Sequence, residues 1–193
     1  MNEISYIHNS IFQPKNQRGI TMKYYQFLFV VLSLVLLMGG VAFAQPEASI
    51  TATATVLSPL TISGDQNLNF GDVLPGVNSS VDKTTDAGTN AGKFSISGNP
   101  SSEINLAFTA LPSTLSDGSN TLSISFSSTD AGHTANSDGS SQTAFDPSSS
   151  TTATLSTGGN LYVFLGGTVQ PTHTQTAGTY TGTVTLQIYY TGN

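Results

Sequence analysis

The last stretch of the chain, Gly178 to Tyr190, constrains the fold more than any other. It reads GTYTGTVTLQIYY, and apolar and polar side chains alternate along it. Successive side chains on a β-strand point to opposite faces of the sheet, so this period of two predicts a strand with one apolar face. The apolar face holds Tyr180, Val184, Leu186, Ile188 and Tyr190, and the polar face holds Thr181, Thr183, Thr185, Gln187 and Tyr189. Another element must cover the apolar face, and the functional question is which one.

The rest of the chain after Gln45 also favours β-structure. Thr, Ser, Gly and Asn are abundant there, and these residues disfavour helix interiors. Short apolar runs alternate with clusters of Gly, Ser, Asn, Asp and Pro, which is typical of an all-β sandwich or barrel. The runs before the closing strand are Ser49–Leu57, Leu60–Ile62, Leu68–Phe70, Lys93–Gly98, Ile104–Phe108, Leu122–Phe126 and Leu161–Leu165. We predict an antiparallel β-sandwich of about seven or eight strands.

Turn residues suggest how some of these runs connect. The sequence Asn99-Pro100-Ser101-Ser102 lies between two runs, and Gly158-Gly159 precedes another, so both are predicted to be hairpin turns. Residues 161–165 carry large side chains on both faces, which predicts a central strand. Residues 127–150 are polar, with Phe145 as their one large apolar side chain. They are predicted to be a surface excursion or a flexible, disordered loop.

The N-terminal part predicts an export signal. Lys23 precedes a nearly unbroken apolar run, and a small-x-small site follows at residues 42–44. This order is typical of a secretory signal peptide; for the alternative, a membrane anchor, the run is somewhat short. We predict an upstream extension at 1–21, a signal peptide at 22–44 and a single β-sandwich domain at 45–193. The expected location is the periplasm, the cell surface or the extracellular medium.

Charge and cysteine content exclude several partners. From residue 45 onward the only basic residues are Lys83 and Lys93, against ten acidic ones. Two cations cannot neutralise a phosphate backbone, so no nucleic-acid partner is expected. An anionic membrane surface is excluded as a partner of the mature chain for the same reason. The chain has no Cys, so its stability must come from packing and strand pairing.

No constellation of catalytic or metal-binding residues is visible. His133 and His173 lie in polar stretches without a second ligand at metal spacing. Asp130, Asp138 and Asp146 recur in one polar stretch, but the D-x-D-x-D-G order of a calcium loop is absent, which favours ordinary solvated loop residues. A G-x-S-x-G nucleophile motif is also absent. We expect no enzyme activity, no cofactor and no metal.

Four tyrosines leave a binding function open. Tyr162, Tyr180, Tyr189 and Tyr190 could form a stacking surface for sugars. The ordinary alternative is that their rings pack in the core and their hydroxyls reach the rim. The first interpretation corresponds to a self-contained, adhesin-like module that binds a glycan or a protein at the cell surface.

Four longer stretches carry a family resemblance. They read ASITATATVLSPLTI, LNFG, GGNLYVFLGGT and AGTYTGTVTLQIYYT. Together they resemble the bacterial secreted domain of unknown function 4402, which is similar to the spore coat protein U and chaperone–usher pilin group. The resemblance implies an immunoglobulin-like sandwich, and for pilins an incomplete one. In pilins an N-terminal extension fills a groove of the neighbouring subunit beside its C-terminal strand, by strand addition.

Carried onto this chain, the resemblance implies a donor and an acceptor. The candidate donor side chains are Ile50, Ala52, Ala54 and Val56, and the candidate docking strand contains Tyr180, Val184, Leu186, Ile188 and Tyr190. The implied function is a secreted structural subunit, pilin-like or coat-like, whose partner is another copy in a homopolymer or a periplasmic chaperone. The chain lacks the usual pilin disulfide, and its Ala-Thr repeat is a light donor. Alternatively, the same segment folds back as the first strand of a complete domain.

Overall fold

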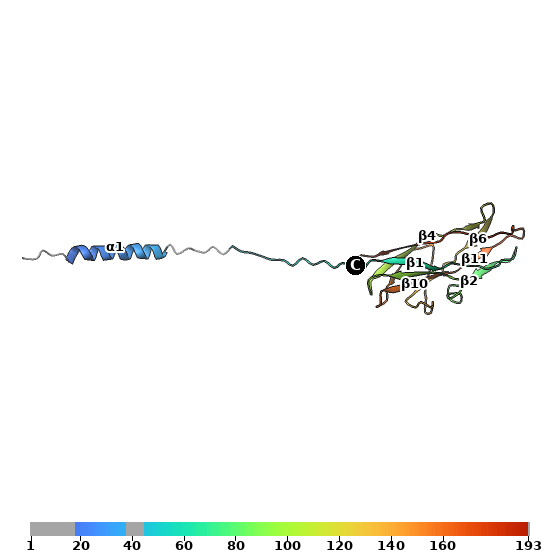
Figure 1. Ribbon diagram of the computed structural model, residues 1–193, viewed down its shortest axis with the longest axis horizontal. Coiled ribbons are helices and arrows are strands. Elements are labelled where there is room, and N and C mark those ends of the chain that lie inside the picture. The colour runs from blue at the N-terminus through green and yellow to red at the C-terminus, as the bar shows by residue number, and fades with distance from the viewer. Residues whose placement is uncertain (1–17, 38–44, 193) are drawn as a thin grey trace, which may run out of the picture. The chain divides into compact units, whose positions relative to one another are not determined.

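The computed structural model describes residues 18–37 and 45–192 (Figure 1). Helix α1, Arg18–Leu37, crosses the predicted boundary between the upstream extension and the signal peptide. The predicted cleavage site at residues 42–44 lies outside the described residues. Within the described parts, no helix is both long and apolar enough to cross a membrane.

The second part of the chain is an all-β domain, as predicted. A compact unit spans Ala54–Asn193, and all of its strand pairs are antiparallel. The strands are β1 Thr61–Gln66, β2 Ser79–Val81, β3 Gly92–Ser97, β4 Glu103–Ala110, β5 Thr114–Ser116, β6 Thr121–Ser125, β7 Ala131–Thr134, β8 Thr143–Phe145, β9 Thr151–Thr154, β10 Asn160–Leu165, β11 Gly167–Gln170 and β12 Thr185–Tyr190. The described residues thus contain more strands than predicted. The additional ones are short and rich in Thr and Ser, so the apolar pattern does not mark them.

Three sheets form the sandwich. Their strand orders are β1-β3-β10-β7-β8, β2-β11-β6-β5 and β12-β4-β9. Figure 1 shows β1, β4 and β10 toward one end of the domain and β2, β6 and β11 toward the other. The main core cluster joins the first sheet to the third, with Ile96, Leu161, Val163 and Leu165 from β3 and β10 and Ile104, Leu106 and Leu186 from β4 and β12. A smaller cluster of Leu122, Ile124 and Val169 belongs to the second sheet.

Strand β10 is central, as its two-sided pattern predicts. It pairs with β3 on one side and β7 on the other. Val163 is fully buried in the main core, and Phe164, on the opposite face, is fully buried as well. The ring of Phe164 lies beneath Gly139, and the Nζ of Lys93 is 5.6 Å from its centroid. Loops on the outer face of the first sheet therefore bury Phe164.

The polar stretch 127–150 is more structured than the sequence predicts. It contains β7 and β8, which extend the first sheet, and Phe145 packs in the main core. Both cations of this part of the chain hold it: Lys83 Nζ donates to the carbonyl of Thr129 at 2.6 Å, and Lys93 Nζ donates to that of Ser137 at 2.7 Å. These contacts come from distant residues, so the local composition could not reveal them.

Both predicted hairpins are wrong. β3 lies in the first sheet and β4 in the third, so the turn at Asn99–Ser102 crosses from one layer to the other. The turn at Gly158-Gly159 likewise joins β9 of the third sheet to β10 of the first. In both cases the apolar faces of consecutive strands oppose each other across the core. An alternating pattern identifies the buried face of a strand but not the strand that lies beside it.

The run Leu68–Phe70 is not a strand. It follows β1, which continues through Gly64 and Asp65 to Gln66 with a register shift. Asn69 donates its backbone N–H to Asn90 at 2.8 Å, and Leu68 and Phe70 pack against the smaller core cluster. The run therefore supplies apolar side chains from a loop, at a place that becomes important for the site.

The facing of β12 can be tested by a pair of substitutions. Ile188 packs against the main core, whereas its neighbour Gln187 is exposed. We expect Ile188→Asp to lower the free energy of unfolding by on the order of 3 kcal/mol or more, because it places a charge against apolar side chains. Gln187→Asp is the matched control and should change the stability by less than about 0.5 kcal/mol. Chemical denaturation measures both, and equal effects would contradict the facing.

Candidate strand-docking site

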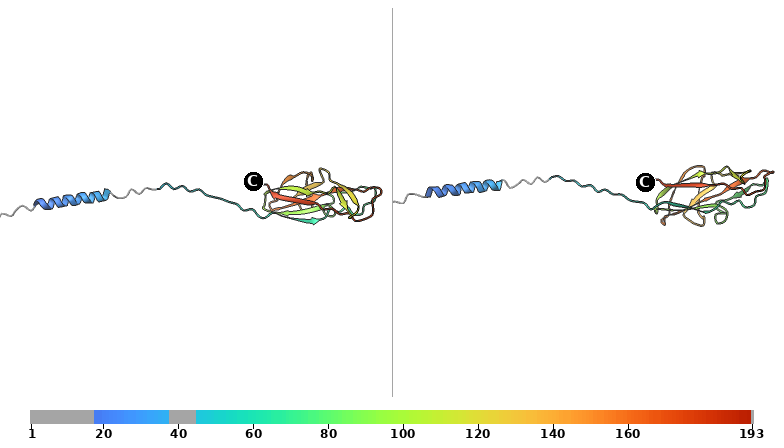
Figure 2. Two further views of the ribbon diagram at one scale, coloured as in Figure 1. Left: turned by 90° about the horizontal axis from the view of Figure 1, so that it is seen from above. Right: turned by 45° about the horizontal axis from the view of Figure 1, so that its top comes forward.

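Strand β12 is an edge strand. It pairs with β4 and lies at the end of its three-stranded sheet, so within the described residues its other edge has no strand partner. Figure 2 shows β12 as the red arrow next to the C-terminal end of the chain. Leu186 is 6% exposed and Tyr189 is 51% exposed, which confirms the predicted apolar and polar faces. Ile188 and Tyr190 are partly buried against the main core. An unpaired edge beside a buried apolar face is a template for another strand.

The stretch before β12 is less paired than predicted. The predicted strand begins near Tyr180, but β12 begins at Thr185, and only an isolated bridge between Thr181 and Ser116 precedes it. The neighbouring strand β4 explains this difference. It ends at Ala110. Two residues later Pro112, which has no N–H to donate, interrupts the ladder of hydrogen bonds. A Cβ on Gly182 would lie 2.7 Å from Leu115 Cδ2, so the backbone approaches that side chain closely.

A cavity of about 1110 Å³ opens beside this stretch. One wall comes from residues 64–75 and the other from residues 175–184. Its apolar lining includes Phe94, Leu115, Leu122, Ile124, Leu165 and Val169. Of the predicted docking residues, Tyr180 and Val184 line the cavity, while Leu186, Ile188 and Tyr190 continue along the same chain and pack on the main core. Two of the five predicted residues therefore line a groove of mixed polar and apolar character, and the other three follow them in β12.

Sequence reasoning missed the opposite wall of this groove. Leu68, Phe70 and Val73 line it from a loop, and the lining from β5, β6 and β11 comes from short strands. The apolar pair Leu68 and Phe70 is visible in the sequence, but its alternation predicts a strand instead of a loop. Only the path of the chain after β1 places these side chains opposite Tyr180.

The predicted first strand, Ser49–Leu57, does not form. Residues 45–60 are in no helix or strand. Ile50 is 96% exposed and Val56 is 94% exposed, and Ala52 and Ala54 are exposed as well. Among the described residues, this segment therefore forms no strand. A strand needs a ladder partner, and this alternating segment has none in the structure.

Tyr190 ties the beginning of the domain to the end of β12. Its hydroxyl donates to the carbonyl of Ser58 at 2.9 Å and accepts the backbone N–H of Asn99 at 2.7 Å. A Cβ on Gly98 would lie 2.6 Å from this hydroxyl, so glycine there permits the close approach. The N-terminal segment thus joins the domain beside one end of the docking strand.

The four tyrosines do not form one stacking surface. Tyr190 faces inward, and the Tyr180 hydroxyl donates to the carbonyl of Thr176 at 2.7 Å within the groove wall. Tyr162 lies on β10 with Lys93 Nζ 5.0 Å from its ring centroid, and Tyr189 is exposed on the outer face of β12. Each ring has a different environment.

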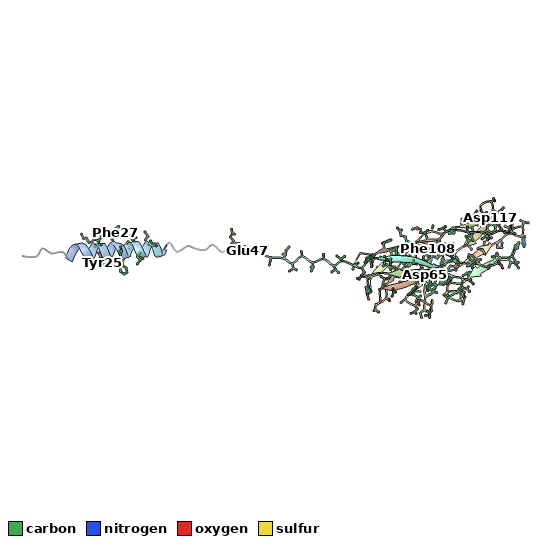
Figure 3. The ribbon with its side chains drawn as sticks, in the orientation of Figure 1. Tyr25, Phe27, Glu47, Asp65, Phe108 and Asp117 are labelled. Carbon is green, nitrogen blue, oxygen red and sulfur yellow. The ribbon has the colours of Figure 1, made fainter. Side chains whose placement is uncertain are left out.

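His133 and the carboxylates of residues 127–150 contact an aromatic ring or the backbone of nearby turns. His133 lies on β7 with its ring centroid 6.0 Å from that of Phe145, and burial lowers its pKa. The carboxylates of Asp130, Asp138 and Asp146 accept N–H groups of their own turns. Figure 3 places Asp117 near one tip of the domain and Asp65 nearer its middle. In the part of the chain that the structure describes, no three His, Asp or Glu side chains are grouped to hold a metal ion.

Comparison with known proteins identifies no related sequence. A scan of the sequence against protein-family models finds no match, and a search of curated proteins finds no similar sequence. The groove, the unpaired edge and the exposed segment are therefore the observations from which a function is inferred.

We expect the free energy of unfolding to depend on pH because of His133. Burial favours the neutral imidazole, so the pKa of His133 is lower in the folded than in the unfolded chain. The unfolded chain then binds more protons below about pH 6.5, and the free energy of unfolding should fall as the pH is lowered through that region. His133→Gln should remove this fall, as measured by denaturation between about pH 7 and 5.

At lower pH, we expect a second loss of stability in both the wild type and His133→Gln. Hydrogen bonds from Asn120 lower the pKa of Asp117, and the N–H groups of Thr85 and Ser140 lower those of Asp82 and Asp138. Groups with lowered pKa values lose their contribution as the pH falls below about 4. Identical curves for the two proteins above pH 5 would contradict the role of His133.

Proposed function

We propose that this protein is an exported structural subunit, pilin-like or coat-like, that assembles by β-strand addition. The observation that carries the proposal is the coexistence of two unpaired elements in one chain. One is the edge of β12 together with the groove lined by the residues just before it, and the other is the exposed alternating segment Ser49–Leu57. In this proposal the domain is an incomplete immunoglobulin-like sandwich, which agrees with the resemblance to domain of unknown function 4402.

The dimensions of donor and acceptor match. The donor segment Ser49–Leu57 would extend over roughly 30 Å at about 3.3 Å per residue. The acceptor, from Tyr180 to Tyr190, is of similar length, and most of its outer edge has no ladder partner among the described residues. A strand docked there would place Ile50, Ala52, Ala54 and Val56 toward the groove and the intervening Thr side chains toward solvent.

The donor would bind mainly through its backbone. Burying a large aliphatic side chain stabilises by about 1.5–3 kcal/mol, and only Ile50 and Val56 are of that kind. Association costs roughly 4–15 kcal/mol in lost freedom, so these two residues cannot hold a complex alone. Ladder hydrogen bonds, each worth about 1 kcal/mol, must supply much of the rest. The proposal therefore depends on the edge of β12 as much as on the cavity.

Charge also favours this segment as the contact. From Gln45 onward the chain carries two lysines against ten acidic residues, a net charge of 2 − 10 = −8, so two mature copies repel each other at long range. The donor segment Ser49–Leu57 has no charged residue, and Asp72 is the only ionisable carboxylate among the groove residues. A neutral strand brings no charge of its own into this groove. The partner in the proposal is another copy of the chain, or a periplasmic chaperone that supplies a strand before assembly.

Removal of the segment tests the proposal. The mature chain that starts at Gln45 should form oligomers at high concentration. A shorter chain that starts at Pro59 should remain monomeric, because this shorter chain keeps the groove but lacks the donor segment. A peptide of sequence SITATATVL should bind the shorter chain and raise its melting temperature. Analytical ultracentrifugation and thermal denaturation measure these outcomes.

Two altered peptides give a matched control. The change Ala54→Asp places a charge on the face that enters the groove, and Thr55→Asp places it on the opposite face. The first should bind at least about tenfold more weakly than the second, because an unpaired charge is costly in an apolar site. Equal binding of the two altered peptides would refute strand addition. So would stable monomers of both chains, from Gln45 and from Pro59, that do not bind the SITATATVL peptide.

A further inference from the structure

The outer face of the first sheet carries a row of small polar side chains that ends at a tyrosine. Ser63 on β1 pairs with Ser95 on β3, and Ser95 pairs with Tyr162 on β10. Leu161 and Val163, the neighbours of Tyr162 in β10, are buried in the main core. Because side chains alternate along a strand, this row points away from the core. The two serines leave a low surface beside the larger, partly buried ring of Tyr162.

The serines of this row are poor residues for their positions. Strands favour β-branched and aromatic side chains, because these pack against their neighbours across the sheet. β3 lies inside its sheet, between β1 and β10, and yet its outward positions after Lys93 are Ser95 and Ser97. Departures from local preference that bring no gain in packing are expected at functional positions.

A carboxylate is fixed beside these serines. Asp65 is exposed and lies at the register shift between Gly64 and Gln66 of β1, and such irregularities redirect side chains (Figure 3). The Ser63 hydroxyl donates to Asp65 Oδ1 at 2.9 Å, and the Ser95 hydroxyl donates to Asp65 Oδ2. A carboxylate accepts about four hydrogen bonds, and a hydroxyl that donates to it becomes a better acceptor itself. We call these three side chains and Tyr162 the shelf.

Charge around the shelf favours an uncharged ligand. Lys93 Nζ donates to the carbonyl of Ser137 at 2.7 Å and lies 5.0 Å from the ring centroid of Tyr162, so this cation is already engaged. A second cation at the same ring would be repelled by Lys93. An anionic polymer would be repelled by the acidic excess of the mature chain. The complementary ligand is therefore neutral and rich in groups that donate hydrogen bonds.

We propose that the shelf binds one sugar residue of a neutral polysaccharide. A sugar ring has an apolar C–H face, which packs against an aromatic ring such as Tyr162, and hydroxyl groups along its edge, which donate to Asp65 and the two serines. Tyr162 and Ser63 are two strand spacings apart, roughly 10 Å, which accommodates one sugar ring. Phe94, which lines the groove, lies on the opposite face of β3. Sugar binding therefore does not compete with a strand in the groove, and the inference is independent of the proposed function.

Titration of the mature chain with neutral hexasaccharides tests the inference. The probes are cellohexaose, maltohexaose and chitohexaose, and the readout is the NMR signals of the backbone amides. A shallow shelf covers little of its ligand, so we expect a dissociation constant on the order of 1 mM. At least one probe should shift the signals of residues 63–65, 93–97 and 160–162. No shift with any probe up to about 10 mM, or shifts confined to the groove residues 175–184, would overturn the inference.

Two variants locate the binding on the shelf. Ser95→Val adds a side chain that strands favour, so the fold should be kept, but it fills the shelf and removes the donor to Asp65. Asp65→Asn keeps the shape of the side chain and removes its charge. Each should weaken binding at least about tenfold, because a hydrogen bond to a charged group is worth that much or more.

Each variant has a matched control. Ser123→Val changes an exposed serine of β6 in the second sheet, and Asp117→Asn changes an exposed carboxylate near one tip of the domain (Figure 3). Both controls should bind as wild type does. Unchanged binding by a folded Ser95→Val would contradict the inference, and so would equal weakening by the controls. If Ser95→Val does not fold, as its melting temperature shows, the comparison of Asp65→Asn with Asp117→Asn decides.

A charged probe separates sugar recognition from simple ion pairing. The hexasaccharide of glucosamine, in its protonated form, carries a positive charge on each sugar. It should bind no more tightly than the best neutral hexasaccharide. Binding at least about tenfold tighter than that of every neutral probe would show that Asp65 merely attracts cations, and would overturn the inference. The titrations use dilute monomer, so their outcome does not depend on whether the chain forms oligomers.

Discussion

The unpaired edge of β12 is the constraint on which the rest of the structure depends. Its side chains Leu186 and Ile188 belong to the main core, so the strand cannot leave the domain without opening that core. Its backbone, however, has a ladder partner on one side only within the described residues. The domain therefore holds rigidly in place an edge that remains unsatisfied. The strand addition proposed above requires this combination of a fixed position and an open edge.

The groove follows from an interruption in the neighbouring strands. Pro112 separates β4 from β5, so the stretch from Tyr180 to Val184 lies beside the domain with only one bridge. On the opposite side, the chain leaves β1 as a loop and brings Leu68 and Phe70 to the facing wall. Among the described residues, no additional strand lies between these two segments. The groove, with both polar and apolar lining, is consequently open there.

The two ends of the docking system meet at Tyr190. Its ring contributes to the core, and its hydroxyl connects Ser58, which follows the exposed segment, with the turn at Asn99. One side chain thus connects the residues just before β1 to the end of β12.

The sequence alone determined the fold class, the facing of the closing strand and the central position of β10, because alternation and two-sided burial are local properties of a strand. It also predicted a strand at Ser49–Leu57 and hairpins at Asn99 and Gly158 that do not exist. Those features depend on which strands lie side by side, and a pattern of alternation carries no information about the partner. Only the tertiary structure decided that β12 is an edge strand, that Leu68 and Phe70 complete the groove, and that residues 127–150 are held by two lysines. Each of these depends on contacts between residues distant in sequence.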